Sequence, residues 1–221
     1  MNLKTFTLTL SSTRPIQGTS SELRGFFATK FTEYSLLHQH NADRLIYRYP
    51  LVQYKMIDGA PMVIGINDGA EVLKQVYDKY DEIKLGEEVY EIVEKGIAVR
   101  NQEFGLSDKF HSYELVTPWL ALNQENYMKY YGLKNHEETQ EFLRRTLAGN
   151  LLSMSKSLDY QVPERIKCEV QVRIRKSRLK DINVMTFIGG FCTNFLIPDY
   201  LGIGKSVSRG FGAVKQITNE K

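Results

Sequence analysis

Apolar and polar residues alternate at the start of the chain and then recur at a helical period, which predicts a strand followed by a helix. Residues 3–10 alternate as in a strand with one buried face. Thr19 and Glu22 have the spacing of a capping box, so a helix is expected to follow them and to end near Leu37. Asp58-Gly59 is a hairpin signal between two extended stretches. The remaining elements predicted in this half are strands at 45–57, 62–66 and 88–99 and a helix that begins near residue 67.

These elements follow the order strand, helix, strand, strand, helix, strand, which is that of the ferredoxin-like fold, the fold of RRM domains. The pattern starts again near Phe110 and repeats with its second helix shortened or lost. Its elements are strands at 110–117, near 170–175, at 182–191 and at 211–217, and helices at 124–131 and 137–158. We therefore predict the α+β class, with two tandem ferredoxin-like βαββαβ domains at residues 1–105 and 106–221, the second of them modified.

Composition restricts the class of protein. Of 221 residues, 42% are hydrophobic and 25% are charged, which is enough apolar material for a core and excludes disorder as the main state. Cys168 and Cys192 lie in apolar stretches and are expected to be reduced core residues. We find neither a membrane-spanning run nor a signal-peptide core, so we expect no membrane contact and a cytoplasmic location.

Positive charge is concentrated in one stretch rather than spread over the chain. Residues 165–180 contain seven basic residues and one acid, Glu169, although the formal net charge is only +3. Val172 and Ile174 alternate with Arg173 and Arg175, so a strand here carries both arginines on one face. Such a face suits a run of phosphates. The alternative is an ordinary solvated face of a sheet.

A glycine-rich segment near the C-terminus reads LGIGKSVSRGFGAV at residues 201–214. Glycine permits positive φ and lets backbone N–H groups approach a ligand, which with basic neighbours suits the binding of phosphates. A P-loop is excluded because Asp199 stands where its first glycine is required. A purely structural turn is the alternative. The candidate RNA-binding residues of this segment are Gly202, Gly204, Lys205, Arg209, Gly210 and Gly212.

The doubled Gly-apolar-Gly motif resembles the C-terminal glycine-rich motif of the repeat-associated (RAMP) superfamily of CRISPR-associated proteins. Within it, the chain is similar to the endoribonucleases that cut precursor CRISPR RNA in its repeats, the b subtype above all. The supporting stretches are LRGF at 23–26, YRYPLVQYK at 47–55, GIN at 65–67, TPWLALN at 117–123 and GNLLSM at 149–154. The resemblance implies tandem ferredoxin-like folds, a precursor CRISPR RNA repeat as partner, and metal-independent cleavage that leaves a cyclic phosphate, with no cofactor. An effector complex and a homodimer are further associations that it raises.

The resemblance also places the active-site histidine in the loop after the first helix, with a tyrosine and a lysine nearby in some members. His38 and His40 lie there. Histidine suits proton transfer because its unperturbed pKa of about 6.5 is near neutral. We expect one to act as base and the other as acid, or one of them only to position RNA. Lys30 is the candidate cation for the phosphate. Tyr47 either orients the nucleotide at the cut, shares in proton transfer or is a core residue.

Two functions therefore compete. The first is an endoribonuclease that uses the 2′-hydroxyl of its substrate as nucleophile, and the second is a non-catalytic RNA-binding subunit of a CRISPR effector complex. The histidine pair favours the first. His111 and His136 are interpreted as surface or structural residues, and no histidine pair has acids at the spacing of a metal site. A phosphate enzyme with a small-molecule substrate is a more remote third hypothesis.

Overall fold

The computed structural model describes residues 1–38, 40–41, 44–45, 48–180 and 182–218. The chain divides into two compact units near residue 103. The N-terminal unit contains residues 2–102 together with Val207–Gly210. The C-terminal unit contains Met1, Glu103–Ser206 and Phe211–Lys221. A short piece of the glycine-rich segment is therefore part of the N-terminal unit. A single domain boundary along the sequence cannot describe this division.

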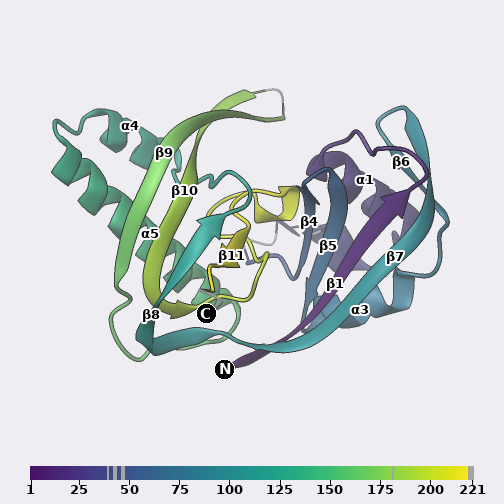
Figure 1. Cartoon of the computed structure of the whole chain (residues 1–221), viewed down its shortest axis with the longest axis horizontal. Helices are drawn as coiled ribbons and strands as arrows, with labels where there is room; N and C mark the ends of the chain where they lie inside the picture. Colours follow the sequence, from purple (N-terminus) through teal and green to yellow (C-terminus); the bar gives the residue numbers. More distant parts are fainter. Residues whose placement is uncertain (39, 42–43, 46–47, 181, 219–221) are drawn as a thin grey trace. The chain divides into compact units, whose positions relative to one another are not determined.

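The N-terminal unit is a sheet with α1 and α3 on one face (Figure 1). The strand order is β4-β5-β1-β7-β6, so the first four strands have the ferredoxin-like order and β6 extends the sheet at one edge. Its elements are β1 (Asn2–Ser12), α1 (Ser20–Lys30), α2 (Ser35–His38), β2 (His40–Asn41), β3 (Arg44–Leu45), β4 (Val52–Ile57), β5 (Ala60–Ile66), α3 (Asp68–Val76), β6 (Glu82–Leu85) and β7 (Glu88–Glu103).

Aromatic rings pack at the centre of this unit. Phe27 of α1 is fully buried, and its ring centroid lies 5.6 Å from that of Tyr54 and 5.4 Å from that of Tyr80. The predicted capping box is present, because the Thr19 and Glu22 side chains exchange hydrogen bonds with each other's backbone N–H. This cap fixes the start of α1, and the packing of Phe27 fixes which face of α1 covers the sheet.

The first helix is shorter than the sequence predicts. We expected it to reach Leu37, but α1 ends at Lys30, and Phe31 leaves the helical conformation with φ −122° and ψ 60°. A turn follows, and α2 begins at Ser35 and supplies the buried Leu37 itself. The apolar periodicity continues because two helices share it in succession. A single helix reaching Leu37 would have placed Lys30 in the middle of its apolar face; Lys30 is instead exposed at the end of α1.

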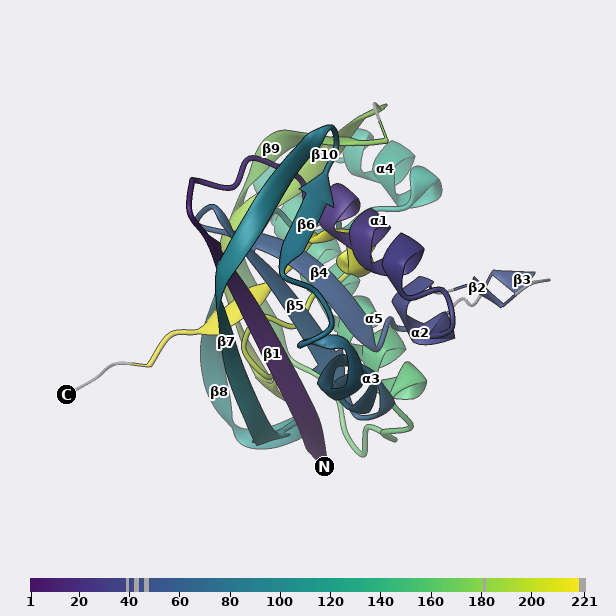
Figure 2. The same cartoon turned by 90° about the vertical axis from the view of Figure 1, so that its right-hand side faces the viewer.

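The C-terminal unit repeats the ferredoxin-like strand order as β11-β8-β10-β9, with α4 and α5 on one face of the sheet (Figure 2). Between β10 and β11, where that fold has its second helix, the chain instead carries the glycine-rich segment, part of which packs in the N-terminal unit. The two domains are thus tandem ferredoxin-like folds of the α+β class, the second modified. Its elements are β8 (Gly105–Leu115), α4 (Gln124–Tyr131), α5 (His136–Ser157), β9 (Cys168–Leu179), β10 (Ile182–Leu196) and β11 (Val214–Gln216). The short 3₁₀ turn η1 (Val207–Arg209) lies between β10 and β11 in the sequence but belongs to the N-terminal unit.

Trp119 joins the strands and helices of this unit. Its side chain is fully buried, its Nε1 donates a hydrogen bond of 3.0 Å to Asn150 Oδ1, and its ring packs on Phe187. The 117–123 and 149–154 stretches of the sequence motif therefore meet in the core. Among the described residues, no helix is both long and apolar enough to span a bilayer.

Candidate active site

His38 is the last residue of α2, and its ring is oriented by the end of α1. His38 Nε2 lies 3.2 Å from the carbonyl oxygen of Phe31. A carbonyl oxygen can only accept a hydrogen bond, so Nε2 carries the hydrogen. In the neutral ring, Nδ1 therefore has the free lone pair and is the nitrogen able to take up a proton.

Two further hydrogen bonds hold the C-terminal end of α2. The guanidinium of Arg24 donates to the His38 carbonyl, and Tyr54 Oη donates to the Leu37 carbonyl at 3.2 Å. Carbonyls at the end of a helix have no partner inside the helix, so these side chains satisfy them. Burial raises the pKa of Tyr54, which keeps its phenol protonated as a donor.

Sequence reasoning did not identify Arg24 and Tyr54 as part of the site. Both lie in stretches that carried the resemblance, LRGF and YRYPLVQYK. The available signal was Arg24 itself, a charged residue between the inward-facing Leu23 and Phe27, both of which are fully buried. A cation in such a position needs a polar partner.

The structure places the remaining predicted catalytic residues unevenly. His40 lies in the two-residue strand β2, where it pairs with Leu45 of β3. One residue separates it in the sequence from His38, the last residue of α2. Lys30 is exposed on the last turn of α1, next to the Phe31 carbonyl that His38 contacts. Lys30 and His38 are therefore at the same end of α1. Tyr47 lies outside the described residues.

Lys55 is a fully buried cation that the sequence analysis did not consider. It follows Tyr54 on β4, and its Nζ donates a hydrogen bond of 3.0 Å to Gln53 Oε1. Burial lowers the pKa of Lys55 to about 7. The amine is thus partly neutral near physiological pH.

The glycines of the C-terminal segment are used by the fold itself. Gly210 has φ +89°, and a Cβ at this position would lie 2.2 Å from Ser20 Oγ of α1. Gly212 has φ +68°, and a Cβ there would lie 2.0 Å from the Ile203 carbonyl oxygen. No side chain fits at either position, so both glycines are required for close packing.

Two amides of this segment already have protein partners. Gly210 N donates to the Val207 carbonyl at 3.2 Å, and Gly212 N donates to the Pro118 carbonyl at 2.9 Å. That the segment binds RNA stays a prediction for all six of its candidate residues. Its side chains Lys205, which is exposed, and Arg209, which is half-buried, are better placed for RNA than these two amides.

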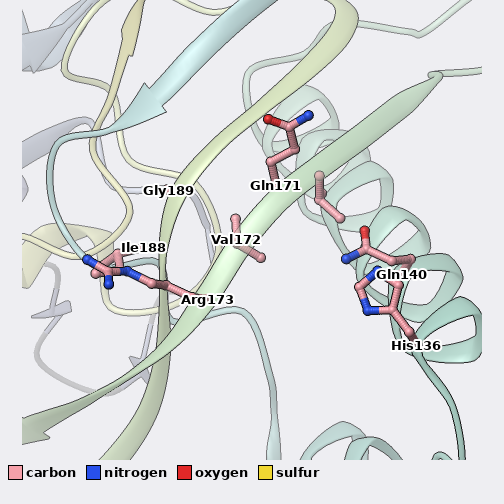
Figure 3. Close-up of a pocket in the computed structure, with 8 residues that line it drawn as sticks. His136, Gln140, Gln171, Val172, Arg173, Ile188 and Gly189 are labelled. Carbon is pink, nitrogen blue, oxygen red and sulfur yellow. The ribbon is translucent and has the colours of Figure 1, made fainter.

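The basic strand forms as predicted. Arg173 and Arg175 of β9 are both exposed, and they pair with Ile188 and Thr186 of β10. Arg173 is at the side of a shallow hollow of about 560 Å³, which also includes Val172 of β9 (Figure 3). His136 and Gln140 reach toward this hollow from the first turns of α5 (Figure 3). The sequence left His136 as a surface or structural residue, and the structure places it, exposed, at this open surface.

Comparison with known proteins assigns the chain to a family. A model of the Cas6b N-terminal domain matches residues 1–103, and a model of the Cas6b C-terminal domain matches residues 105–217. The chain belongs to the Cas6b family. The two family domains of Cas6b meet where the structure divides into its compact units, near residue 103.

Solved Cas6b structures are similar to this chain over its whole length. A crystal structure of Cas6b is 36% identical, covers 98% of this chain and 100% of its own, and superposes with a TM-score of 0.89. A second, the crystal structure of a CRISPR RNA processing endoribonuclease Cas6b, is 34% identical with the same coverage and a TM-score of 0.78. The uncharacterized protein MJ0978 of Methanocaldococcus jannaschii is 40% identical over 137 residues, which are 62% of this chain and 92% of that protein.

Proposed function

We propose that this Cas6b-family chain is an endoribonuclease that cuts precursor CRISPR RNA within its repeats, without a metal ion. The 2′-hydroxyl upstream of the cut acts as nucleophile, and the products carry a 2′,3′-cyclic phosphate and a 5′-hydroxyl. One similar solved structure is that of a CRISPR RNA processing endoribonuclease. The observation that carries the mechanism is the fixed ring of His38, whose Nε2–H is bonded to Phe31 so that Nδ1 is left as the proton acceptor.

The chemistry requires two proton transfers. A base removes the proton of the 2′-hydroxyl as its oxygen bonds to phosphorus, and an acid protonates the 5′-oxygen as the P–O5′ bond breaks. His38 and His40 share these two steps in our proposal. Lys30 stabilises the negative charge that builds on the phosphate, and Tyr47 orients the nucleotide at the cut.

Basic side chains hold the RNA substrate through its backbone. In our proposal Arg173 and Arg175 of β9 and Lys205 and Arg209 of the glycine-rich segment contact the RNA backbone, supported by the exposure of the first three. Gly202, Gly204, Gly210 and Gly212 shape the segment that presents them. Such contacts depend on phosphates and weaken as the salt concentration rises.

The first test is cleavage of repeat RNA by the full chain in EDTA, with the product ends mapped. Wild type cuts at one position, and His38→Ala and His40→Ala each lower the single-turnover rate by about 10²–10⁴-fold, the usual contribution of a proton-transfer group. A 2′-deoxy nucleotide immediately upstream of the cut abolishes cleavage because it removes the nucleophile. A requirement for Mg²⁺ would contradict the mechanism.

His111→Ala is the matched control, since it removes a histidine whose ring nitrogens contact Ser107 and Gln216 in the C-terminal unit. It should cleave like wild type. If wild type binds the repeat but never cuts it, the chain is instead a non-catalytic RNA-binding subunit of an effector complex. Light scattering with and without RNA tests the proposed homodimer, and co-purification with the effector proteins tests that association.

A further inference from the structure

Two arginines from opposite ends of the sequence come together in the N-terminal unit. Arg209 belongs to η1, which packs against α1 and β4 within this unit. The residue after it, Gly210, lies directly against Ser20 of α1. Ser20 and Arg24 are four residues apart and so share one face of α1. The face of α1 that carries Arg24 is therefore the face that η1 covers.

The two guanidinium groups have no described carboxylate to offset their charge. Neither Arg24 nor Arg209 forms an ion pair among the described residues, in contrast to Arg14, which is bonded to Glu88. Burial lowers the pKa of Arg24, and the positive charge of Arg209 lowers it further. Like charges held together at a half-buried position are unfavourable unless an anion joins them.

Arg24 also has unused hydrogen-bonding capacity. One of its terminal nitrogens donates to the His38 carbonyl, but its Nε is buried and has no hydrogen-bond partner in the part of the chain that the structure describes. A guanidinium carries five N–H donors in a planar fork that matches the oxygens of a phosphate. The pair thus has the donors and the charge of an anion site.

We propose that Arg24 and Arg209 form a binding site for one phosphate of the RNA backbone, at the cut or directly beside it. The inference rests on the proposed function and adds to it a residue, Arg24, and a ligand group. Because Arg24 is bonded to the His38 carbonyl, a phosphate held by Arg24 lies close to the end of α2 that carries the catalytic candidate. Arg24 then links the position of His38 to the presence of substrate.

The test measures binding of an uncleavable repeat RNA, which carries the 2′-deoxy nucleotide at the cut, by fluorescence anisotropy over a series of salt concentrations. Arg209→Met and Arg24→Gln each weaken binding roughly 10- to 100-fold, as expected for a lost charge-assisted contact. The slope of the logarithm of the association constant against the logarithm of the salt concentration is negative. In the double variant it becomes less negative by about 0.7, the value for one phosphate of a single strand. The double variant's loss of affinity is smaller than the product of the two single losses, because both arginines hold the same phosphate.

Arg14→Met is the matched control, because it removes the same charge from the same unit at a guanidinium that Glu88 already offsets. Its salt slope and affinity stay at the wild-type values. Arg24→Gln also disturbs the end of α2, so thermal unfolding of each variant is recorded. Among the described residues, Arg209 forms no hydrogen bond to α2. Arg209→Met therefore carries the test by itself if Arg24→Gln unfolds.

A wild-type salt slope in both Arg209→Met and the double variant overturns the site. The proposed function fails by a different result, which is the absence of cleavage by the wild type. If wild type binds without cutting and the arginine variants weaken that binding, the anion site stands and the nuclease mechanism falls. If wild type cuts and the arginine variants bind normally, the nuclease stands and the anion site falls.

Discussion

The residue with the least usual environment is Lys55, whose amine is fully buried and bonded to the neutral side chain of Gln53. Transfer of a charged amine out of water is costly, and the lowered pKa of about 7 expresses that cost. In the unfolded chain the same amine has its ordinary pKa of about 10.4. Between these values the unfolded state binds more protons than the folded state, so stability must rise with pH in this window.

We predict that Lys55→Met removes this pH dependence. For wild type, the contribution of Lys55 to the free energy of unfolding increases by about 2 kcal/mol from pH 7 to pH 9. The reason is that the unfolded state still binds the proton in this range, whereas the folded state has released it. The measurement is urea unfolding at several pH values for both proteins. The difference in the free energy of unfolding between Lys55→Met and wild type should be largest at or below pH 7 and should shrink toward pH 10. A difference that is constant with pH would show that Lys55 is not buried as a nearly neutral amine.

At this scale the sequence identified candidate side chains by their chemical type and their place after the first helix. His38 was found because the family resemblance places an active-site histidine after the first helix and because an imidazole suits proton transfer near neutral pH. Arg24 and Tyr54 were missed, since their partners are distant carbonyls, 14 positions later than Arg24 and 17 positions earlier than Tyr54. No local pattern records such a bond, which exists only after α2 has folded against α1 and β4.

At the scale of elements, the glycine-rich segment shows that the glycines of a sequence motif can be required by the fold itself. Gly212 is buried with positive φ and lies against the Ile203 backbone. Gly149, in contrast, is an exposed glycine inside α5, where a Cβ would meet nothing within 4 Å. The same substitution should therefore have opposite effects at the two positions.

We predict that Gly212→Ala lowers the midpoint of thermal unfolding and that Gly149→Ala raises it. At Gly212 the added methyl group collides with backbone atoms and the conformation is strained, which typically costs more than 1 kcal/mol. At Gly149, alanine favours the helix by about 0.5–1 kcal/mol. Differential scanning calorimetry of both variants measures the two shifts. A neutral Gly212→Ala would show that the segment can move to accept a side chain.

Elements were predictable where one local signal decided them. The capping box decided the start of α1, and Asp58-Gly59, two residues that both have positive φ, decided the hairpin. The end of α1 was not, because Phe31 is buried both as the cap of one helix and as a neighbour of the next. Periodicity measures which side of the chain is buried, and it continues through a break when both helices bury the same side. The short strand β6 was missed for lack of any comparable signal.

At the scale of the whole molecule, the same strand order occurs in both units, and the repeat was visible in the order of predicted elements. The exchange of Val207–Gly210 into the N-terminal unit was not, since only tertiary packing determines it. This short piece is joined on both sides to residues of the C-terminal unit, Ser206 and Phe211. Neither unit can therefore unfold without disturbing the chain that enters the other.

We predict that the two units unfold together. Trp119 is the chain's only tryptophan and is buried in the C-terminal unit, so its fluorescence reports on that unit. Phe27→Ala removes a ring from the N-terminal core and should destabilise that unit by about 3–5 kcal/mol. The denaturation midpoint of Trp119 fluorescence should fall together with that of far-ultraviolet circular dichroism. An unchanged Trp119 transition would show that the units unfold independently, and Ser21→Ala on the surface of α1 serves as the unperturbed control.

The tether between His38 and the Phe31 carbonyl has a consequence for repeated turnover. The nitrogen that holds the tether keeps its hydrogen whether the imidazole is neutral or cationic, so the grip is the same in both states. In the proposed mechanism, every proton that His38 takes up or gives away is therefore carried by Nδ1. The ring therefore needs no reorientation between its neutral and cationic forms, and in the proposed mechanism the same geometry serves each successive round of cleavage.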